Sequence, residues 1–244
     1  EEGGPKGEEF GGELMMKEGA LENPKVDVIF VLHLSAQTEV GKIKYRPASI
    51  MAAVDDMKLT IKGKPSHGSR PWASVDPIVV SAQIINSLQT IVSRNVDLTQ
   101  NPAVVTIGAI NGGNRSNIIS EQVEMLGTIR TFSKEDRTLI FKRINEIVDN
   151  TAKAYGATAV IELPYSSSYP VTFNDEKLTA TMLSTLEKSV GKENVVLMPA
   201  MTGAEDFSFF AKKSAWSVFF YRRHDQRKRS RNFRSTSYTA IFNR

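Results

Sequence analysis

Residues 56–62 read DMKLTIK, with an apolar side chain at every second position. This alternation predicts a half-buried β-strand, because successive side chains of a strand point to opposite faces of a sheet. A loop rich in glycine and proline follows, and Asp76 then stands directly before Pro77. A capping residue followed by proline is typical of a helix start. This strand and helix open the most regular block of the chain, which decides its fold.

The predicted helix is followed by two segments rich in β-branched residues. Residues 103–110 and 122–132 are both predicted to be strands, because apolar and β-branched side chains alternate between turn residues. The buried stripe of the helix itself is expected to contain apolar residues at helical spacing, namely Ile78, Ala82, Ile85, Leu88 and Val92.

A second helix and a last strand complete the block. Ser133 is expected to cap this helix with Asp136 as its capping-box partner, and Gly156 is expected to end it. Residues 158–163 form the last predicted strand. The order β-α-β-β-α-β is that of a ferredoxin-like α+β domain, which we expect to span residues 54–163.

The segments on both sides of this block have the pattern of an α/β layer. Residues 26–34, VDVIFVLHL, are a nearly continuous apolar run, which predicts a buried, parallel strand. A helix is expected at 175–190 and another buried strand at 216–221. The expected fold class is therefore α/β, with one layer built by residues 1–53 and 164–221 and the α+β domain inserted into it.

The charge of the chain is concentrated in its last residues. Residues 222–244 hold seven Arg and one Lys against one acid, so residues 1–221 are mildly acidic although the whole chain carries +4. We expect this basic tail to be solvated and disordered, with binding to nucleic acid or to an anionic membrane as the alternative. The chain has no cysteine, which excludes disulfides and thiolate ligands, so a metal site in it would use His and carboxylates.

Features of membrane insertion and export are missing from the sequence. No apolar run reaches the roughly 18 residues that span a bilayer, so we expect no membrane partner. No basic-then-apolar leader follows Glu1, which favours a cytoplasmic location.

Histidine is scarce, with three in the chain. His33 ends the predicted strand at 26–34, and ligands of open α/β sheets gather at the carboxyl ends of strands. Taken alone, this position fits a hydrogen-bonded core histidine better than a metal ligand. His67 lies in the loop GKPSHGSRP at 63–71, where a surface histidine is the alternative, and His224 in the basic tail has no expected role.

Two acidic doublets, Glu1-Glu2 and Glu8-Glu9, stand at the start of the chain. Adjacent carboxylates can divide two tasks, since one can bind a metal while the other takes a proton from metal-bound water. Such doublets are also common on solvated loops, and taken alone they favour that interpretation. The glycine-rich stretch 108–117 lacks Gly-Lys-Ser/Thr and no predicted helix follows it, so it is not expected to bind phosphate.

Several motifs in one order resemble the aminoacylase-like metallopeptidases. This branch includes hippurate hydrolases, N-acyl-amino-acid amidohydrolases and auxin-conjugate hydrolases. Each motif is weak by itself, but together they follow the family's order and spacing over about residues 1–221. They are the run from Glu1 to Leu21, Leu32-His33, Gly63 to Gly68, Val75-Asp76-Pro77, Gly112 to Asn117, Gly127 to Arg130, and Gly203-Ala204-Glu205-Asp206-Phe207.

The resemblance implies a catalytic domain that binds two divalent metal ions, zinc or manganese. It assigns Glu1 as the general base, Glu2 as a metal ligand and His33 as a second metal ligand. The substrate it implies is a small N-acylated amino acid or peptide, whose amide is attacked by metal-activated water. The two flanking segments, residues 1–53 and 164–221, would be parts of this catalytic domain.

The same resemblance implies that the inserted α+β domain is a dimerisation domain, which makes the protein a homodimer. His67, Asn117 and Arg130 would come from this domain and hold the substrate carboxylate or the developing oxyanion. In the family such residues often serve the site of the partner subunit. The role fits the chemistry, because attack on an amide builds negative charge that fixed donors must stabilise.

The sequence departs from the family's pattern at both ends. The family's His-x-Cys/His-Gly-His-Asp segment does not precede Glu1, and a basic tail follows Tyr221 where the family continues toward a His-Ser-Pro element. We therefore expect a truncated chain whose tail results from a shifted reading frame. Because Glu2 and His33 are the only implied ligands left, we expect the 244 residues alone to be inactive.

The leading hypothesis is thus a metal-dependent amidohydrolase acting on C–N bonds of linear amides. The alternative is a non-catalytic interaction module that dimerises through residues 54–163. A nucleic-acid-binding role of residues 222–244 ranks last, because no aromatic residues are interleaved with the charges on a structured face. We expect no nucleic-acid partner.

Overall fold

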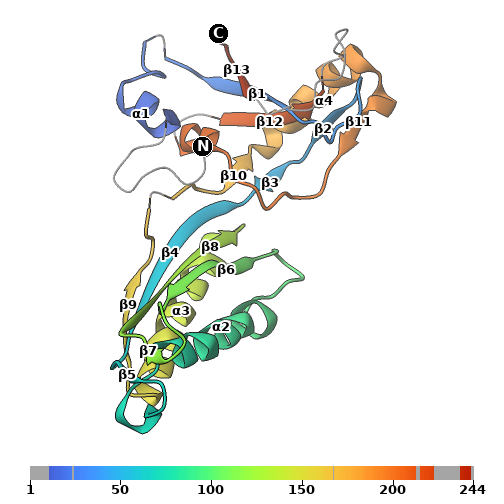
Figure 1. Ribbon diagram of the computed structural model, residues 1–244. Coiled ribbons are helices and arrows are strands. Elements are labelled where there is room, and N and C mark those ends of the chain that lie inside the picture. Colours follow the sequence, from blue (N-terminus) through green and yellow to red (C-terminus); the bar gives the residue numbers. More distant parts are fainter. Residues whose placement is uncertain (1–10, 24, 167, 213–214, 223–236, 243–244) are drawn as a thin grey trace, which may run out of the picture. The chain divides into compact units, whose positions relative to one another are not determined.

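The computed structural model describes all residues except 1–10, 24, 167, 213–214, 223–236 and 243–244 (Figure 1). The chain divides into two compact units. The satellite unit contains residues 53–169, and the divided unit is built by two distant segments, residues 10–52 and 170–244. In the part of the chain that the structure describes, no helix has the length and apolar character required to cross a membrane.

The satellite unit is a four-stranded antiparallel sheet with two helices (Figure 1). The strand order is β6-β8-β4-β9, so β6 and β9 are the edge strands. Along the chain the elements run β4, α2, β6, β8, α3, β9, which confirms the predicted β-α-β-β-α-β order. Their bounds are β4 Ala53–Lys62, α2 Pro77–Arg94, β6 Val104–Gly112, β8 Gln122–Thr131, α3 Lys134–Ala154 and β9 Thr158–Glu162.

The alternation in β4 and β8 places their apolar side chains on one face of the sheet, in a core shared with both helices. Met57, Leu59 and Ile61 of β4 are fully buried there, together with Met125 and Ile129 of β8. Burying a side chain of this size stabilises the fold by roughly 1.5–3 kcal/mol. The period of two in the sequence therefore determines which face of the sheet forms the core.

The buried stripe of α2 differs from the predicted one. Ile78 is 45% exposed and Ala82 is also exposed, so the prediction is wrong for these two residues. The helix carries apolar side chains on more than one side, and spacing alone does not select the side that the sheet covers. The hydrophobic residues of α2 that are fully or almost fully buried are Val80, Ile84, Leu88 and Ile91.

Local signals at the helix ends act as predicted. Asp76 Oδ1 accepts a hydrogen bond from the backbone N–H of Ile78 at 2.9 Å. The Ser133 hydroxyl oxygen accepts one from the N–H of Asp136 at 3.0 Å, and the hydroxyl donates to the Asp136 carboxylate at 2.7 Å. Gly156 follows α3 with a φ of 75°, a conformation in which a side chain would be strained.

A five-stranded sheet lies at the centre of the divided unit, with the strand order β11-β2-β12-β1-β13. Strands β1 and β12 are parallel, as predicted for the apolar run at 26–34. Ile29, Val31 and Val218 are buried in its core. The bounds are α1 Gly11–Lys17, β1 Val28–Leu34, β2 Ile43–Tyr45, β3 Ala48–Met51, β10 Thr172–Asn174, α4 Glu176–Val190, η2 Lys192–Asn194, β11 Val195–Leu197, η3 Asp206–Lys212, β12 Ala215–Tyr221 and β13 Ser237–Phe242.

Strand β13 corrects the expectation that the whole basic tail is disordered. Residues 237–242 pair antiparallel with β1, from Phe242 opposite Val28 to Ser237 opposite His33. Their sequence, SYTAIF, is rich in β-branched and aromatic residues, and the edge of β1 offers unpaired backbone groups. The average composition of the tail does not reveal this short segment, because the charged residues outweigh it. Residues 223–236 of the tail lie outside the described residues.

Candidate active-site residues

His33 lies near the carboxyl end of β1, opposite Phe220 of the parallel strand β12. Its imidazole ring contacts the Phe220 ring with a centroid distance of 4.9 Å and a tilt of 48°. The side chain is 16% exposed, so part of it can reach a ligand. The carboxyl ends of parallel strands are where ligands gather in open α/β sheets, and His33 has that position.

A carboxylate far away in the sequence holds the His33 ring. His33 Nδ1 lies 3.0 Å from Glu205 Oε2, and the Glu205 side chain is 9% exposed. An ionised carboxylate can only accept a hydrogen bond, so this contact places the proton of a neutral ring on Nδ1 and the lone pair on Nε2, the nitrogen with which the ring would bind a metal. Glu205 was not predicted as a site residue, although the motif at 203–207 contained it.

Asp206 joins this arrangement from the first position of η3. Burial raises the pKa of the Asp206 carboxyl, and its hydrogen bond to Glu205 and the negative charge of Glu205 raise that pKa further. A hydrogen bond from the backbone N–H of Gly12 in α1 acts in the opposite direction. A side chain at position 12 would not fit, because a Cβ there would lie 2.7 Å from the Asp206 carbonyl oxygen.

The residues around His33 fit one metal ligand and its supporting carboxylate. Histidines that bind metals usually donate their second ring N–H to a carboxylate or carbonyl, which is the arrangement of His33 and Glu205. In the part of the chain that the structure describes, no three His, Asp or Glu side chains are grouped closely enough to hold a metal. The other implied residues, Glu1 and Glu2, lie outside the described residues.

In the satellite unit the structure brings His67 and Asn117 together. Strand β5 (Ser66–His67) pairs antiparallel with β7 (Ile118–Ile119), with His67 opposite Ile118. The next residue, Gly68, donates its backbone N–H to the Asn117 carbonyl at 2.7 Å. A Cβ on Gly68 would lie 3.1 Å from the Asn117 backbone, so glycine permits this close approach. Two loops distant in sequence thus form one exposed tip.

The His67 ring is oriented by its own turn. The backbone N–H of Ser69 donates to His67 Nδ1 at 3.2 Å, and the Ser69 hydroxyl lies 2.7 Å from the same nitrogen. Because a backbone N–H always donates, Nδ1 is an acceptor, and a neutral ring carries its proton on Nε2. His67 therefore offers an N–H donor to whatever approaches this tip.

Arg130 is separate from that tip. It lies within strand β8, between Val54 of β4 and Val104 of β6, in the segment 122–132 that the sequence predicts to be a strand. The opposite end of β8, at Gln122, adjoins the tip, and eight residues of extended strand separate the two positions by about 26 Å. Arg130 consequently does not share a binding site with His67 and Asn117 within the satellite unit.

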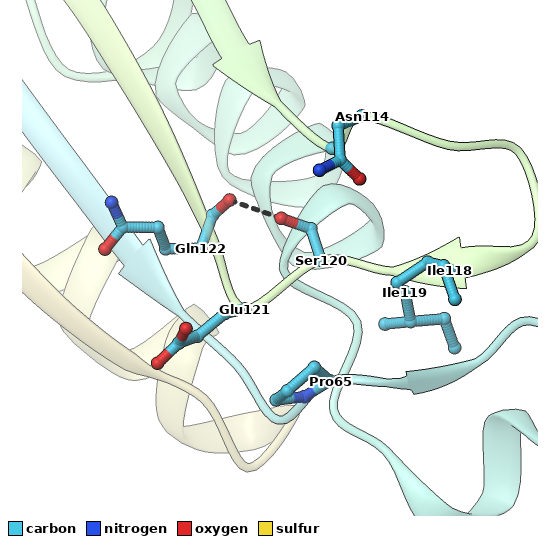
Figure 2. Close-up of a pocket in the computed structure, with 8 residues that line it drawn as sticks. Pro65, Asn114, Ile118, Ile119, Ser120, Glu121 and Gln122 are labelled. Atoms are coloured by element: carbon cyan, nitrogen blue, oxygen red, sulfur yellow. Dashed lines mark hydrogen bonds between the residues drawn. The ribbon is translucent and has the colours of Figure 1, made fainter.

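An open hollow lies beside the tip (Figure 2). It measures about 370 Å³. The Ser120 hydroxyl donates to the Gln122 carbonyl at 2.8 Å across one wall of it. None of the predicted site residues lines this hollow, whose walls are Pro65, Gly113, Asn114 and Ile118 to Gln122.

Comparison with known proteins finds relatives of both units. Residues 54–156 match the family model M20_dimer, described as the peptidase dimerisation domain. The N-acetyldiaminopimelate deacetylase of Streptococcus sanguinis is 35% identical over 212 residues, which cover 87% of this chain and 55% of that protein. The similarity therefore extends well beyond the satellite unit.

Two solved structures support the same class. A protein of methicillin-resistant Staphylococcus aureus described as an aminohydrolase has a TM-score of 0.78 and 28% identity, over 90% of this chain and 55% of that one. A Bacillus subtilis protein described as a dinuclear metal-binding peptidase of the M20 family has a TM-score of 0.68 and 27% identity, over 86% of this chain and 51% of that one.

These matches relate the chain, over most of its length, to the metal-dependent amidohydrolases and peptidases of the M20 family. Within the chain, residues 54–156 are the part that matches the peptidase dimerisation domain. The predicted α/β layer with an inserted β-α-β-β-α-β domain is the fold of its structural neighbours. The chain spans about half the length of the relatives and structures it matches.

Proposed function

We propose that this chain supplies a metal ligand and substrate-binding groups to an amidohydrolase that cleaves N-acylated amino acids with metal-activated water. His33 is the proposed ligand of a zinc or manganese ion. His67 and Asn117 are the proposed donors to the substrate carboxylate or the oxyanion. The observation that carries the proposal is the hydrogen bond between His33 Nδ1 and the buried Glu205 at the end of β1.

Three features favour this function over a purely structural role of His33. The first is its carboxylate partner, Glu205, because a core histidine needs none, whereas a metal-binding ring gains orientation and basicity from one. The strand end is the common ligand position of such sheets. The relatives also point to this chemistry, since one is named a deacetylase of an N-acetyl amino acid and another a dinuclear metal-binding peptidase.

The test begins with metal binding by the purified chain. Zn²⁺ and Mn²⁺ are titrated against it in competition with a chromophoric chelator, with His33→Ala as the variant and His224→Ala as the matched control. We expect His33→Ala to remove the tightest binding and His224→Ala to leave it unchanged. Equal binding by the wild type and His33→Ala would contradict the proposal.

Hydrolysis is then measured with a panel of N-acetyl amino acids, including N-acetyldiaminopimelate, by following the released amine. Any activity that the chain does have must disappear with a chelator and in His33→Ala, because the metal activates the attacking water. Activity that survives in His33→Ala would also contradict the proposal.

We propose further that the chain forms a homodimer through β6 and the outer side of α2. Strand β6 is an edge of the satellite sheet, and its unpaired backbone groups can pair with another strand. Ile110 of β6 is 49% exposed, and Ile78 and Val79 of α2 are 45% and 49% exposed. Gly113, which follows β6, lies beside Ile78 of α2, because a Cβ built on Gly113 would be 3.5 Å from the Ile78 Cδ1 atom. The exposed residues of β6 and α2 can therefore belong to one surface.

The two edges of the satellite sheet provide a matched test of this interface. Ile110→Glu on β6 places a charge in the proposed interface, and Val160→Glu on β9 places one on the opposite edge, where Val160 is 45% exposed. Sedimentation velocity is expected to show a dimer for the wild type and Val160→Glu and a monomer for Ile110→Glu. A wild-type monomer, or an Ile110→Glu dimer of unchanged affinity, would exclude this interface.

A further inference from the structure

We infer that Glu205 is a positioning residue that fixes His33 in the Nδ1–H form and thereby presents Nε2 to the metal. This inference rests on the proposed function of His33. It assigns a role to a residue that does not itself bind the metal or the substrate. The supporting observations are the contact between the two side chains, the burial of Glu205 and the way the fold holds each of them.

The contact determines the tautomer because of the chemistry of its two partners. Glu205 Oε2 and His33 Nδ1 are 3.0 Å apart, which is an ordinary hydrogen-bond distance. A carboxylate has no proton to donate, so the ring must donate from Nδ1. The Glu205 side chain is 9% exposed and that of His33 is 16% exposed, so water competes weakly for this bond.

The fold holds both partners in place from different segments. His33 is fixed by its strand, since β1 pairs with β12 in parallel and with β13 antiparallel. Phe220 of β12 lies against the ring and limits its rotation. Glu205 is fixed by the following turn, where its carbonyl accepts the backbone N–H of Ser208 at 3.1 Å. Gly203 is anchored to the same unit, because its carbonyl accepts the N–H of Ala52 at 3.0 Å.

This arrangement has two consequences for a bound metal. The ring cannot turn to offer Nδ1 without breaking the hydrogen bond to Glu205. The negative charge of Glu205 also increases the electron density that Nε2 donates to the metal. Removing such a supporting carboxylate usually lowers metal affinity about 10–100-fold.

The first experiment measures the tautomer without any metal. Two-bond ¹⁵N–¹H correlation spectra distinguish the protonated from the unprotonated nitrogen of each imidazole ring. The chain has three histidines, so their signals can be assigned by comparison with single His→Ala variants. We expect the Nδ1–H form for His33 in the wild type and in Glu205→Gln, whose amide oxygen still accepts. We expect the Nε2–H form to gain population in Glu205→Ala. Glu18→Ala, which removes an exposed acid from the same unit, is expected to change nothing.

The second experiment measures Zn²⁺ affinity in the same variants. Glu205→Ala is expected to weaken it about 10–100-fold, Glu205→Gln less, and Glu18→Ala not at all. Circular dichroism checks that each variant is folded, and Glu205→Gln carries the test if Glu205→Ala unfolds. An Nε2–H ring in the wild type, an unchanged tautomer in folded Glu205→Ala, or an unchanged Zn²⁺ affinity in every folded Glu205 variant would overturn the inference. If Zn²⁺ binding is instead insensitive to His33→Ala, the proposed function fails and the tautomer result still stands.

Discussion

The satellite unit and the divided unit differ in how the chain builds them. The satellite unit is one continuous segment, 53–169, and the strands of its four-stranded sheet that follow one another along the chain are connected through a helix or a loop. The divided unit joins residues 10–52 to residues 170–244, and its central pair of strands links Val28 to Ala215. Each unit has its own buried core. The fold of a continuous unit can therefore be recognised from the periodicity of its sequence, whereas the fold of a divided unit depends on contacts that no local sequence pattern encodes.

The candidate site residues differ in the same way. His67 and Asn117 meet through a short antiparallel pairing inside one unit, between β5 and β7. His33 meets Glu205 only because β1 lies beside β12 and the turn before η3 returns to it. Predictions that separate the two units test whether this difference extends to their stability.

The largest effect is expected from Arg137→Met in the satellite unit. Asp55 is 1% exposed and is bound by the Arg137 guanidinium through two hydrogen bonds of 2.7 Å, and the Ser168 hydroxyl also donates to it. Removing Arg137 leaves a buried carboxylate without its cation, which typically costs about 3–5 kcal/mol. Urea unfolding and hydrogen exchange of peptides from 53–169 measure the loss.

Arg143→Met on the same helix is the matched control. Arg143 pairs with Glu146 on the surface of α3, with both side chains more than a third exposed. Exposed pairs contribute roughly 0–1 kcal/mol. If the two variants lose the same free energy of unfolding, burial does not explain the Asp55 pair.

Intermediate effects are expected from alanine at two glycines, one in each unit. A Cβ at Gly127 would lie 2.5 Å from the Thr106 carbonyl, and one at Gly12 would lie 2.7 Å from the Asp206 carbonyl. Overpacking of this kind costs typically about 1–3 kcal/mol. We expect Gly127→Ala to raise hydrogen exchange in residues 53–169 and Gly12→Ala to raise it in the divided unit.

Gly108→Ala is the control for both substitutions, because no atom lies within 4 Å of its Cβ position. Its effect is expected to stay within about 0.5 kcal/mol. If hydrogen exchange rises equally throughout the chain for both Gly12→Ala and Gly127→Ala, the two units unfold together. They would then not differ in stability as separate units.

The smallest effect, equal in both units, is expected at the helix caps. Asp76 caps α2 in the satellite unit, and Asp175 caps α4 in the divided unit by accepting the Leu178 N–H at 2.7 Å. Replacing either by alanine should lower the free energy of unfolding by about 1 kcal/mol. Thermal unfolding of both variants checks this. A markedly larger loss for Asp175→Ala would mean that its role extends beyond the cap.

Much of the fold followed from the sequence, and the misses have physical causes. The caps at Asp76 and Ser133 were predicted because they act within three or four residues. The stripe of α2 was misjudged because two of its sides are apolar. Strands of three or four residues, such as β2 and β3, carry too few positions for a period of two to be recognised.

The site could be predicted only in part. The end of the apolar run identified His33, and the motif order identified His67 and Asn117 as residues to examine. Glu205 was missed because its importance depends on a contact across 172 residues. The resemblance grouped Arg130 with His67 and Asn117, but the register of β8 places it at the other end of that strand from their tip.

The sequence by itself determined the β-α-β-β-α-β unit, its caps and the face that each of its central strands buries. These properties depend on dihedral preferences and side-chain spacing within a few residues. Only the tertiary structure decided that Glu205 holds His33, that Gly68 brings His67 to Asn117, and that residues 237–242 add a strand to β1. Those contacts depend on the register of the sheets and on how distant segments of the chain come together. A long-range contact imposes no periodic pattern on the sequence around the residues that make it, so local patterns cannot reveal it.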